Sequence, residues 1–391
     1  MKPSAPHLIR SWMAFSIVLV CSSFFLSAAD KPPASAARFL KNPQKGDLGF
    51  KSIGRLAFGP DGLLLLSDPQ GAAVLAINTS DTGPVVKLGQ KIDTIEIVLA
   101  KALSIEPDAL TIVDMAVNPA SGNIYFSLAT KPGNKPILVT IDGKGTVNHP
   151  QLETMEYVRM TLPVGENAKL HNVTDLAWAD YSVVVAGQSS EELSNKIYQL
   201  PIPLEHGVNA RFFSAETYHV SHKRWETKAQ IQSFIPYEED GELYVVGAFA
   251  CTPIAKFPLG EIEGRDEVKG VSVLELGSGN RPLDMFTYKK DGQGWLITSN
   301  KRFHKKFGPS VYWGARVDMK YLSADGADET NENAPRRNLQ QTSGPDAKGI
   351  EVVDSLYGAV QISQLKNEEV LVLRETDETD TAHSLELVTL P

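Results

Sequence analysis

The sequence predicts an all-β protein, a six-bladed β-propeller with a short helical insertion between its first two blades. One phrase recurs along the chain: an apolar strand, a Pro/Asp/Gly turn and a second apolar strand, as in IVDMAVNPASGNIYFS over residues 112–127. A repeat that cannot bury its own apolar faces must stack on its copies, and units roughly 50 to 80 residues apart fit four-stranded blades with long connections. The repeats begin at Ile53, Ile112, Val173, Ile231, Pro282 and about Ala359.

The individual elements follow from local signals. The first repeat carries Gly59-Pro60-Asp61-Gly62 between two apolar runs, which is typical of a hairpin. Residues 91–104 repeat apolar side chains at helical spacing and predict a short helix packed on the propeller. Residues 323–349 lack an apolar period, so we expect a polar surface insertion there. A strand at about 46–51 is expected to join the last blade, because an open sheet would leave an unpaired edge.

The first residues have the pattern of a secretory signal. Lys2 and Arg10 precede the apolar run Trp12–Leu26, and Ala29 ends a small-residue cleavage site. The run is too short for a comfortable membrane span, and no later run approaches one. We therefore predict a signal peptide over 1–29, a flexible lead-in over 30–45 and a propeller over 46–391. The expected location is secreted or periplasmic, with no integral membrane span after the signal is removed.

The net charge limits the possible binding partners, and the cysteine content limits the possible cross-links. Without Lys2 and Arg10, 38 − 2 = 36 basic side chains face 47 acidic ones, a net charge of −11. An acidic chain without a basic cluster is a poor nucleic-acid binder. Cys251 is then the single cysteine, which excludes an internal disulfide. We expect a monomer that binds a small molecule or a protein.

Aligned repeats place charged side chains at one shared position, the third residue of the inner strand. Asp114, Asp175 and Asp284 occupy it, with Arg55 and Ser233 in two other repeats. Three carboxylates converging on the channel predict a metal site, with Ca²⁺ or another divalent cation as the candidate and no cofactor certain. The alternative is structural: each Asp accepts backbone N–H groups from the next blade, and Arg55 pairs with one of them.

Further polar side chains are expected beside these carboxylates. His171, His222, Glu226 and Arg281 are predicted to gather with Asp175 and Asp284 at the channel mouth and to bind a ligand. His219 and His222 form an H-x-x-H pair. On a strand or turn this spacing directs the rings to opposite sides, which suits zinc poorly without a helix.

The motif itself resembles those of known propellers. The phrase "Φ-x-D-Φ-A-Φ, turn, Φ-Y-Φ" is similar to repeats of the NHL and SMP-30/YVTN-like propellers over most of residues 53–391. Stretches such as HKRWETKAQ and GNRPLDM also resemble a group of secreted bacterial propeller proteins without an assigned activity. The resemblance implies the propeller fold. We expect a binding scaffold that uses loops at one channel mouth, because loops on a rigid sheet framework are where such sites usually lie. Since SMP-30 relatives include metal-dependent lactonases with a channel Glu/Asn/Asp site, a Ca²⁺- or Zn²⁺-dependent hydrolase is the alternative.

Overall fold

The structure is a computed structural model that describes residues 1, 35–250, 253–277, 279–303, 308–324, 326–335, 349–366, 368–376 and 382–391. Ser35–Pro391 forms one compact unit. Apart from residue 1, the predicted signal peptide lies outside the described residues, as do Cys251 and much of the expected polar insertion. Among the described residues, no helix is long and apolar enough to cross a membrane.

The unit is built almost entirely of antiparallel sheets. The first sheet contains β2 (Leu56–Phe58), β3 (Leu63–Asp68), β4 (Ala73–Asn78) and β9 (Glu156–Thr161). The second sheet contains β5 (Leu110–Val117), β6 (Ile124–Thr130), β7 (Pro136–Ile141) and β8 (Val147–Asn148). The late sheets are β20 (Asn280–Lys290), β21 (Gln293–Arg302), β22 (Tyr312–Asp318) and β23 (Ile350–Val353), and β24 (Ala359–Lys366), β25 (Glu369–Glu375) and β26 (His383–Thr389).

Between them lies a nine-stranded sheet. Its strands are β10 (Leu170–Ala179), β11 (Ser182–Ser189), β12 (Asn195–Pro201), β14 (Arg211–His219), β15 (Arg224–Glu226), β16 (Ile231–Glu239), β17 (Glu242–Phe249), β18 (Pro253–Pro258) and β19 (Glu267–Glu275). Two antiparallel halves meet where β14 pairs with β19 in parallel. A small sheet joins β1 (Leu40–Lys41) to β13 (Leu204–Glu205).

Among the residues that the structure describes, the helices are few and short. The α-helix is α1 (Ile95–Leu103), and the 3-10 helices are η1 (Ala36–Phe39), η2 (Pro60–Gly62), η3 (Pro69–Gly71), η4 (Pro107–Ala109), η5 (Leu152–Thr154), η6 (Leu259–Glu263), η7 (Met319–Leu322) and η8 (Asp354–Leu356). The helix predicted over 91–104 is thus present.

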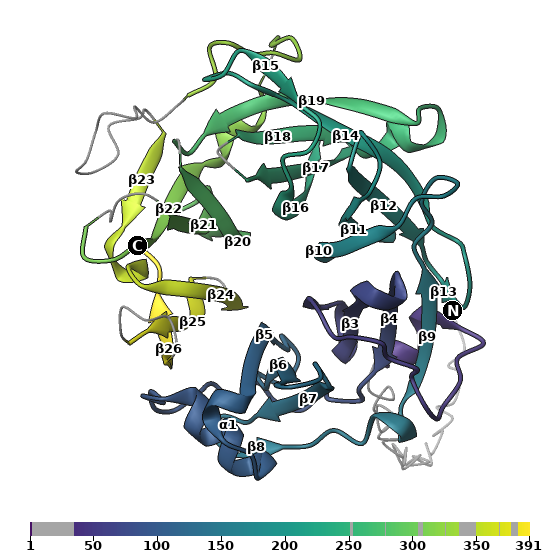
Figure 1. Cartoon of the computed structure of the whole chain (residues 1–391), viewed down its shortest axis with the longest axis vertical. Coiled ribbons are helices and arrows are strands. Elements are labelled where there is room, and N and C mark those ends of the chain that lie inside the picture. The colour runs from purple at the N-terminus through teal and green to yellow at the C-terminus, as the bar shows by residue number, and fades with distance from the viewer. Residues whose placement is uncertain are drawn as a thin grey trace. The chain divides into compact units, whose positions relative to one another are not determined.

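The sheets are arranged like propeller blades around an axis (Figure 1). Strands β2, β5, β24, β20, β16 and β10 lie innermost, each beside the next, and β10 returns to β2. The all-β class and the propeller-like arrangement are confirmed. The sheets do not divide cleanly into six, because the third and fourth predicted repeats share the nine-stranded sheet.

The order of the sheets departs from the order of the chain. The inner strand of the first sheet, β2, lies between β5 and β10, so the second sheet neighbours the last sheet instead of the third. The cause is β9, which follows the whole second sheet and then returns to pair with β4 over six residue pairs. The second sheet is therefore an excursion between the third and fourth strands of the first.

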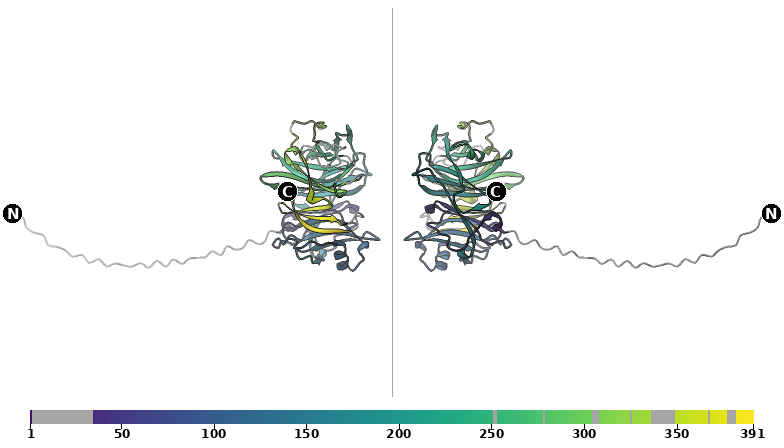
Figure 2. Two further views of the ribbon diagram at one scale, coloured as in Figure 1. Left: turned by 90° about the vertical axis from the view of Figure 1, so that its left-hand side faces the viewer. Right: turned by 90° about the vertical axis from the view of Figure 1, so that its right-hand side faces the viewer.

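Closure of the ring differs from the expectation. The described segment 46–51 forms no strand, and the nearby bridge of Gln44 goes to Tyr157 of β9, not to the last sheet. The last and second sheets meet instead through β24 and β5, which lie side by side, and through α1 and the residues before it. Ile92 bridges Leu385, and the buried Glu96 of α1 accepts a hydrogen bond from the His383 backbone N–H at 3.0 Å. The left-hand view of Figure 2 shows the late yellow strands beside the early blue ones.

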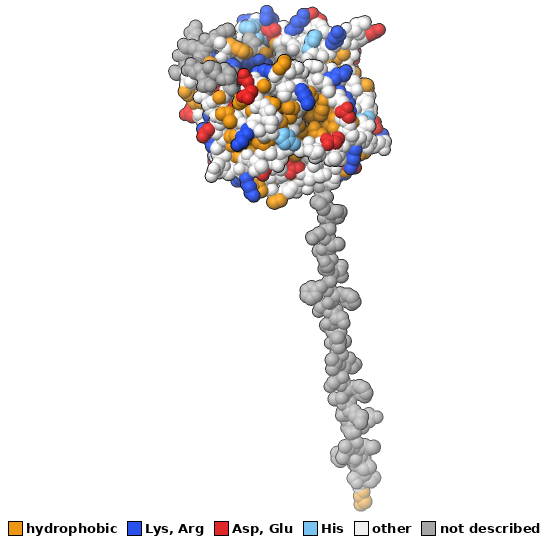
Figure 3. Space-filling model, turned by 60° about the horizontal axis from the view of Figure 1, so that its bottom comes forward, with side chains coloured by type: hydrophobic (Ala, Val, Ile, Leu, Met, Phe, Trp, Pro, Cys, Tyr) orange, Lys and Arg blue, Asp and Glu red, His pale blue; other side chains and the backbone are white. Residues whose placement is uncertain are grey.

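Hydrophobic clusters fill the spaces between neighbouring sheets. The cluster under α1 contains Ile95 and Leu99 of the helix together with side chains of β5, β6 and β25. Within the predicted lead-in, Ala36 and Leu40 are buried in the cluster of the first and third repeats, so this part packs on the ring. Figure 3 turns the part that holds α1 toward the viewer and shows hydrophobic side chains gathered among charged ones.

Candidate functional site

An irregularity shared by the inner strands brings the third positions to the axis. The pairing registers of β5, β10, β16, β20 and β24 each skip one residue just before the third position, at Asp114, Asp175, Ser233, Asp284 and Gln361. The first sheet has a similar irregularity: the Gly54 N–H donates to the Ser67 carbonyl, and the Ser67 N–H donates to the Arg55 carbonyl. A β-bulge bends its strand and re-aims the side chain that follows it. The six third positions therefore share one local geometry.

Each of the three carboxylates holds a neighbouring inner strand. Asp114 Oδ2 accepts the Leu56 N–H of β2 at 2.7 Å. Asp175 Oδ2 accepts the Phe234 N–H of β16 at 2.9 Å, and Asp284 Oδ2 accepts the Ile362 N–H of β24 at 3.0 Å. Acids on alternate inner strands thus bond the residue after the third position of the adjacent strand. This is the structural alternative that the sequence left open.

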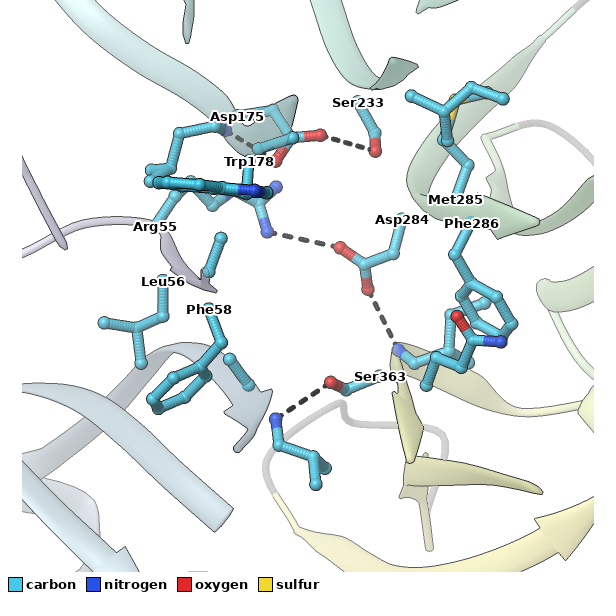
Figure 4. A pocket seen from close by; sticks show the side chains of 18 of the residues that line it. Arg55, Leu56, Phe58, Asp175, Trp178, Ser233, Asp284, Met285, Phe286 and Ser363 are labelled. Carbon is cyan, nitrogen blue, oxygen red and sulfur yellow. Dashed lines mark hydrogen bonds and ion pairs between the residues drawn. The ribbon is translucent and has the colours of Figure 1, made fainter. Parts of the chain in front are cut away.

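Arg55 is the counter-ion of this layer. Its Nη1 lies 2.8 Å from Asp114 Oδ1 and 3.3 Å from Asp284 Oδ1, and its Nε donates to the Thr174 carbonyl at 3.0 Å. Burial alone would lower the pKa of Arg55, but the three surrounding carboxylates raise it above its ordinary value. Figure 4 shows Arg55, Asp175 and Asp284 directed toward one another.

Burial also perturbs the carboxylates. It raises the pKa of Asp284 to about 7 against the pull of Arg55, and the Asp114 charge adds to the rise. It raises the pKa of Asp175 to about 6, although Arg55 and the Ser233 hydroxyl, 2.7 Å away, oppose it. The pKa of Asp114 is raised by burial as well. The charge of this layer therefore changes within the physiological pH range.

The charged layer forms the floor of an axial cavity of about 580 Å³. Above the floor the inner strands contribute mostly apolar side chains, among them Phe58, Trp178 and Phe286, all labelled in Figure 4. Trp178 packs edge-on against Phe39 with ring centroids 4.8 Å apart, and it lies so close to Gly59 that a Cβ there would be 2.8 Å from its ring. The cavity thus joins an apolar, aromatic wall to an ionisable floor.

The floor does not fit a resident divalent cation. Ca²⁺ requires six to eight oxygen ligands. Here Arg55 already occupies the space between Asp114 and Asp284, and one oxygen of each carboxylate is engaged by a backbone N–H. Metal binding by Asp114, Asp175 and Asp284 stays a prediction, and the arrangement favours Arg55 as their partner.

Two of the expected channel-mouth residues lie away from this cavity. His171 is exposed at the bulge near the start of β10, and Arg281 donates from Nε to Gln232 Oε1 at 2.5 Å. Both precede the carboxylates on their strands, whereas the cavity is lined by the residues that follow them. Trp313, on β22, is fully buried and donates from Nε1 to Asn280 Oδ1.

His222 and Glu226 form a separate group with His219 on the β14–β15 hairpin, at the outer edge of the ring (Figure 1). The expectation that H-x-x-H spacing separates the rings is wrong here. A tight turn, in which the His222 N–H donates to the His219 carbonyl, brings the two rings together at an angle of 44° with their centroids 3.8 Å apart. The residues expected at one channel mouth are therefore divided: Asp175 and Asp284 line the axial cavity, and His222 and Glu226 lie on the hairpin.

Gln361 and Trp178 were not predicted as site residues from the sequence. Gln361 occupies the third position of the sixth repeat, and its Nε2 donates to the Val113 carbonyl at 3.2 Å. Its buried Oε1 has no hydrogen-bond partner among the described residues. Extending the repeat alignment to AVQ would have found Gln361. No comparable signal marks Trp178, whose role depends on packing.

No family model and no curated protein matches the chain. Among solved structures it is similar to the PQQ-bound aldose sugar dehydrogenase from Streptomyces coelicolor, with 12% identity, a TM-score of 0.33, and coverage of 92% of this chain and 99% of that one. It is also similar to virginiamycin B lyase from Staphylococcus aureus, with 11% identity, a TM-score of 0.30, and coverage of 89% and 98%. A third similar structure is the GH43 BlXynB protein from Bacillus licheniformis, with 15% identity, a TM-score of 0.34, and coverage of 70% of this chain and 52% of that one. Likenesses this weak support no argument, so the fold description rests on this chain's own sheets.

Proposed function

We propose that this protein is a six-bladed propeller that binds a small organic cation with an apolar body in its axial cavity. Counting the two halves of the nine-stranded sheet as separate blades gives one blade for each of the six inner strands. The single observation that carries the functional proposal is the ionisable floor beneath an aromatic wall. Secretion or export to the periplasm remains the expectation from the N-terminal sequence.

The sign of the expected ligand follows from the charges of the cavity. Three carboxylates against one guanidinium leave 3 − 1 = 2 negative charges in the floor when all are ionised. Lys366, the other charged residue lining the cavity, is exposed at its rim. Hydrogen-bond acceptors dominate the floor, because it contains three carboxylates and one guanidinium. A protonated amine supplies donors and charge together.

The wall suits the rest of such a ligand. Phe58, Trp178 and Phe286 offer aromatic faces and edges in the same cavity as the carboxylates. Aromatic faces attract cations and also stack on apolar groups. A cavity of about 580 Å³ falls in the usual range for small-molecule sites.

The raised acid pKa values make a further prediction about this binding. With a pKa of about 7 for Asp284 and about 6 for Asp175, both are mostly protonated at pH 5 and ionised at pH 8. A bound cation favours the ionised forms, so its affinity rises with pH. Each pKa unit by which the ligand lowers a floor acid corresponds to about tenfold in affinity.

Three probes with one body and different heads test the proposal: 2-phenylethylammonium, 2-phenylethanol and phenylacetate, titrated by NMR into the chain without its signal peptide. We expect the ammonium probe to bind about tenfold or more tightly than phenylacetate at pH 8, with that preference falling about tenfold by pH 5. Asp284→Asn lowers the affinity for the ammonium probe, while the Asn can still accept the Ile362 N–H.

The matched control is Asp240→Asn, the same chemical change at an exposed hairpin turn with a φ of 51°, which Asn tolerates. It leaves binding unchanged. Equal binding of the three probes at pH 8, or an Asp284→Asn variant that binds the ammonium probe as the unaltered chain does, contradicts the proposal and leaves the floor a purely structural lock between strands.

A further inference from the structure

The hairpin of β14 and β15 gathers three metal-ligating side chains from two strands and the turn between them. His219 ends β14, His222 lies in the turn and Glu226 ends β15. His219 Nδ1 and His222 Nδ1 each lie 3.5 Å from Glu226 Oε1. One donor atom from each of the three residues lies within 4.8 Å of the others.

These separations fit a tetrahedral ion. Zn–N bonds of about 2.0–2.1 Å and Zn–O bonds of about 2.0–2.2 Å place neighbouring ligand atoms roughly 3.4 Å apart. The two separations of 3.5 Å match that value without movement of the backbone. His222 is 41% exposed, so solvent reaches the group and a water molecule can complete the coordination.

A buried carboxylate holds the group in place from behind. Glu275, on β19, is 1% exposed. Its Oε1 lies 3.6 Å from His219 Nε2, the ring nitrogen that faces away from Glu226, and accepts the Ser221 N–H at 3.2 Å. The Ser221 hydroxyl bonds to the other oxygen of Glu275. Glu275 thus holds the turn that carries His222 by two hydrogen bonds and lies within ion-pair distance of the His219 ring, a position that outer-shell carboxylates take in zinc sites.

We propose that this hairpin binds one divalent transition-metal ion, Zn²⁺ by preference, through His219 Nδ1, His222 Nδ1 and Glu226 Oε1. Two imidazoles and one carboxylate suit zinc better than Ca²⁺ or Mg²⁺, which take oxygen ligands. The ion cross-links β14 to β15, a strand of three residues. The site lies apart from the axial cavity and is independent of the function proposed for it.

One side chain opposes the ion. Arg224 Nε donates to Glu226 Oε1 at 2.8 Å, which is the oxygen that the two histidines face. Arg224 is 65% exposed, so a metal displaces it at little cost. Removal of Arg224 is therefore expected to strengthen metal binding, which distinguishes a metal site from a purely structural ion-pair network.

The test uses the chain without its signal peptide, purified without a histidine tag, and titrates Zn²⁺ calorimetrically and Co²⁺ by visible absorption. We expect one ion per chain, an intense tetrahedral Co²⁺ spectrum and a higher melting temperature with Zn²⁺. His222→Ala, at a partly exposed position, lowers Zn²⁺ affinity by about a hundredfold or more, since even outer-shell changes cost about 10–100-fold. Glu275→Gln costs about 10–100-fold, and Arg224→Ala strengthens binding a few-fold.

His149→Ala, at an exposed histidine away from the hairpin, is the matched control and leaves binding unchanged. Circular dichroism confirms that each variant is folded. No stoichiometric binding of Zn²⁺ or Co²⁺ overturns the proposal. Binding that persists undiminished in folded His222→Ala also overturns it, because the ion is then held elsewhere.

Discussion

The axial floor and the outer hairpin both combine acids with basic side chains, but they engage them differently. On the axis, Asp114 and Asp284 flank Arg55, and each also holds a backbone N–H of the neighbouring strand. On the hairpin, His219 and His222 face one oxygen of Glu226. The axial acids therefore have protein partners for their charges, whereas the hairpin directs several possible metal ligands toward one point.

This difference explains why the same residue types lead to different inferences. Buried carboxylates must be satisfied, and backbone N–H groups and a guanidinium do so without an ion. The axial acids consequently hold neighbouring inner strands together, and the negative charge that Arg55 does not balance is what attracts the proposed ligand. The hairpin gathers two imidazoles and one carboxylate at tetrahedral spacing in front of a buried outer carboxylate, an arrangement that suits a metal ion.

Removal of Arg55 gives the largest effect that separates these two regions. Arg55→Met leaves the buried Asp114 and the half-buried Asp175 and Asp284 without their counter-ion, and we expect the free energy of unfolding to fall by about 3–5 kcal/mol at pH 8. The loss shrinks at pH 5, because Asp175 and Asp284, with pKa values of about 6 and 7, are then largely neutral. Urea unfolding at the two pH values measures it.

Arg211→Met is the matched control, since Arg211 is exposed and pairs with the exposed Glu263. It changes stability by less than about 1 kcal/mol at either pH. A loss in Arg55→Met that is the same at pH 5 and pH 8 contradicts the assignment of raised pKa values to the floor acids.

The pH dependence of stability gives a smaller effect at the same site. The folded-state pKa of Asp284, about 7, lies above its ordinary value of 3.8, so the folded chain binds more protons than the unfolded chain between these values. Its contribution to stability is therefore fully present below about pH 4 and is lost as the pH rises to about 7. Asp284→Asn removes this dependence.

The measurement is the difference in unfolding free energy between Asp284→Asn and the unaltered chain. We expect the free energy of unfolding of the variant, relative to that of the unaltered chain, to increase from pH 4 to pH 7. The increase is on the order of 1 kcal/mol per unit of the pKa shift. Groups with lowered pKa, such as Asp68 beside Arg159, cancel in this difference. A difference that is flat over this range contradicts the raised pKa.

Much of the fold was predictable from local sequence. Turns such as 59–62 and the helical spacing of 91–104 gave the strands and α1, and the repeat gave the propeller-like arrangement. The exchange of the first two sheets was not predictable. It depends on β9 returning to β4, and β9 carries no turn signal that ties it to the first repeat.

The site was predictable only in part. Repeat alignment found Arg55 and the three acids, but the bulges that aim them inward have no sequence signature. The proximity of His219 and His222 was not predicted, because their spacing was expected to separate the rings even on a turn. The tight turn itself has no sequence signal, since Lys223 stands at a φ of 52°, where glycine or asparagine is usual. His222 therefore appeared to face away from His219.

The pKa of Asp284, followed by ¹³C NMR of its carboxyl group with and without 2-phenylethylammonium, tests the central claim most directly. The account predicts a pKa of about 7 in the free chain and a decrease of about one unit or more when the cation binds. A pKa near the ordinary Asp value, unchanged by the probe, would show that Asp284 is not protonated near neutral pH and that the axial floor does not bind the cation.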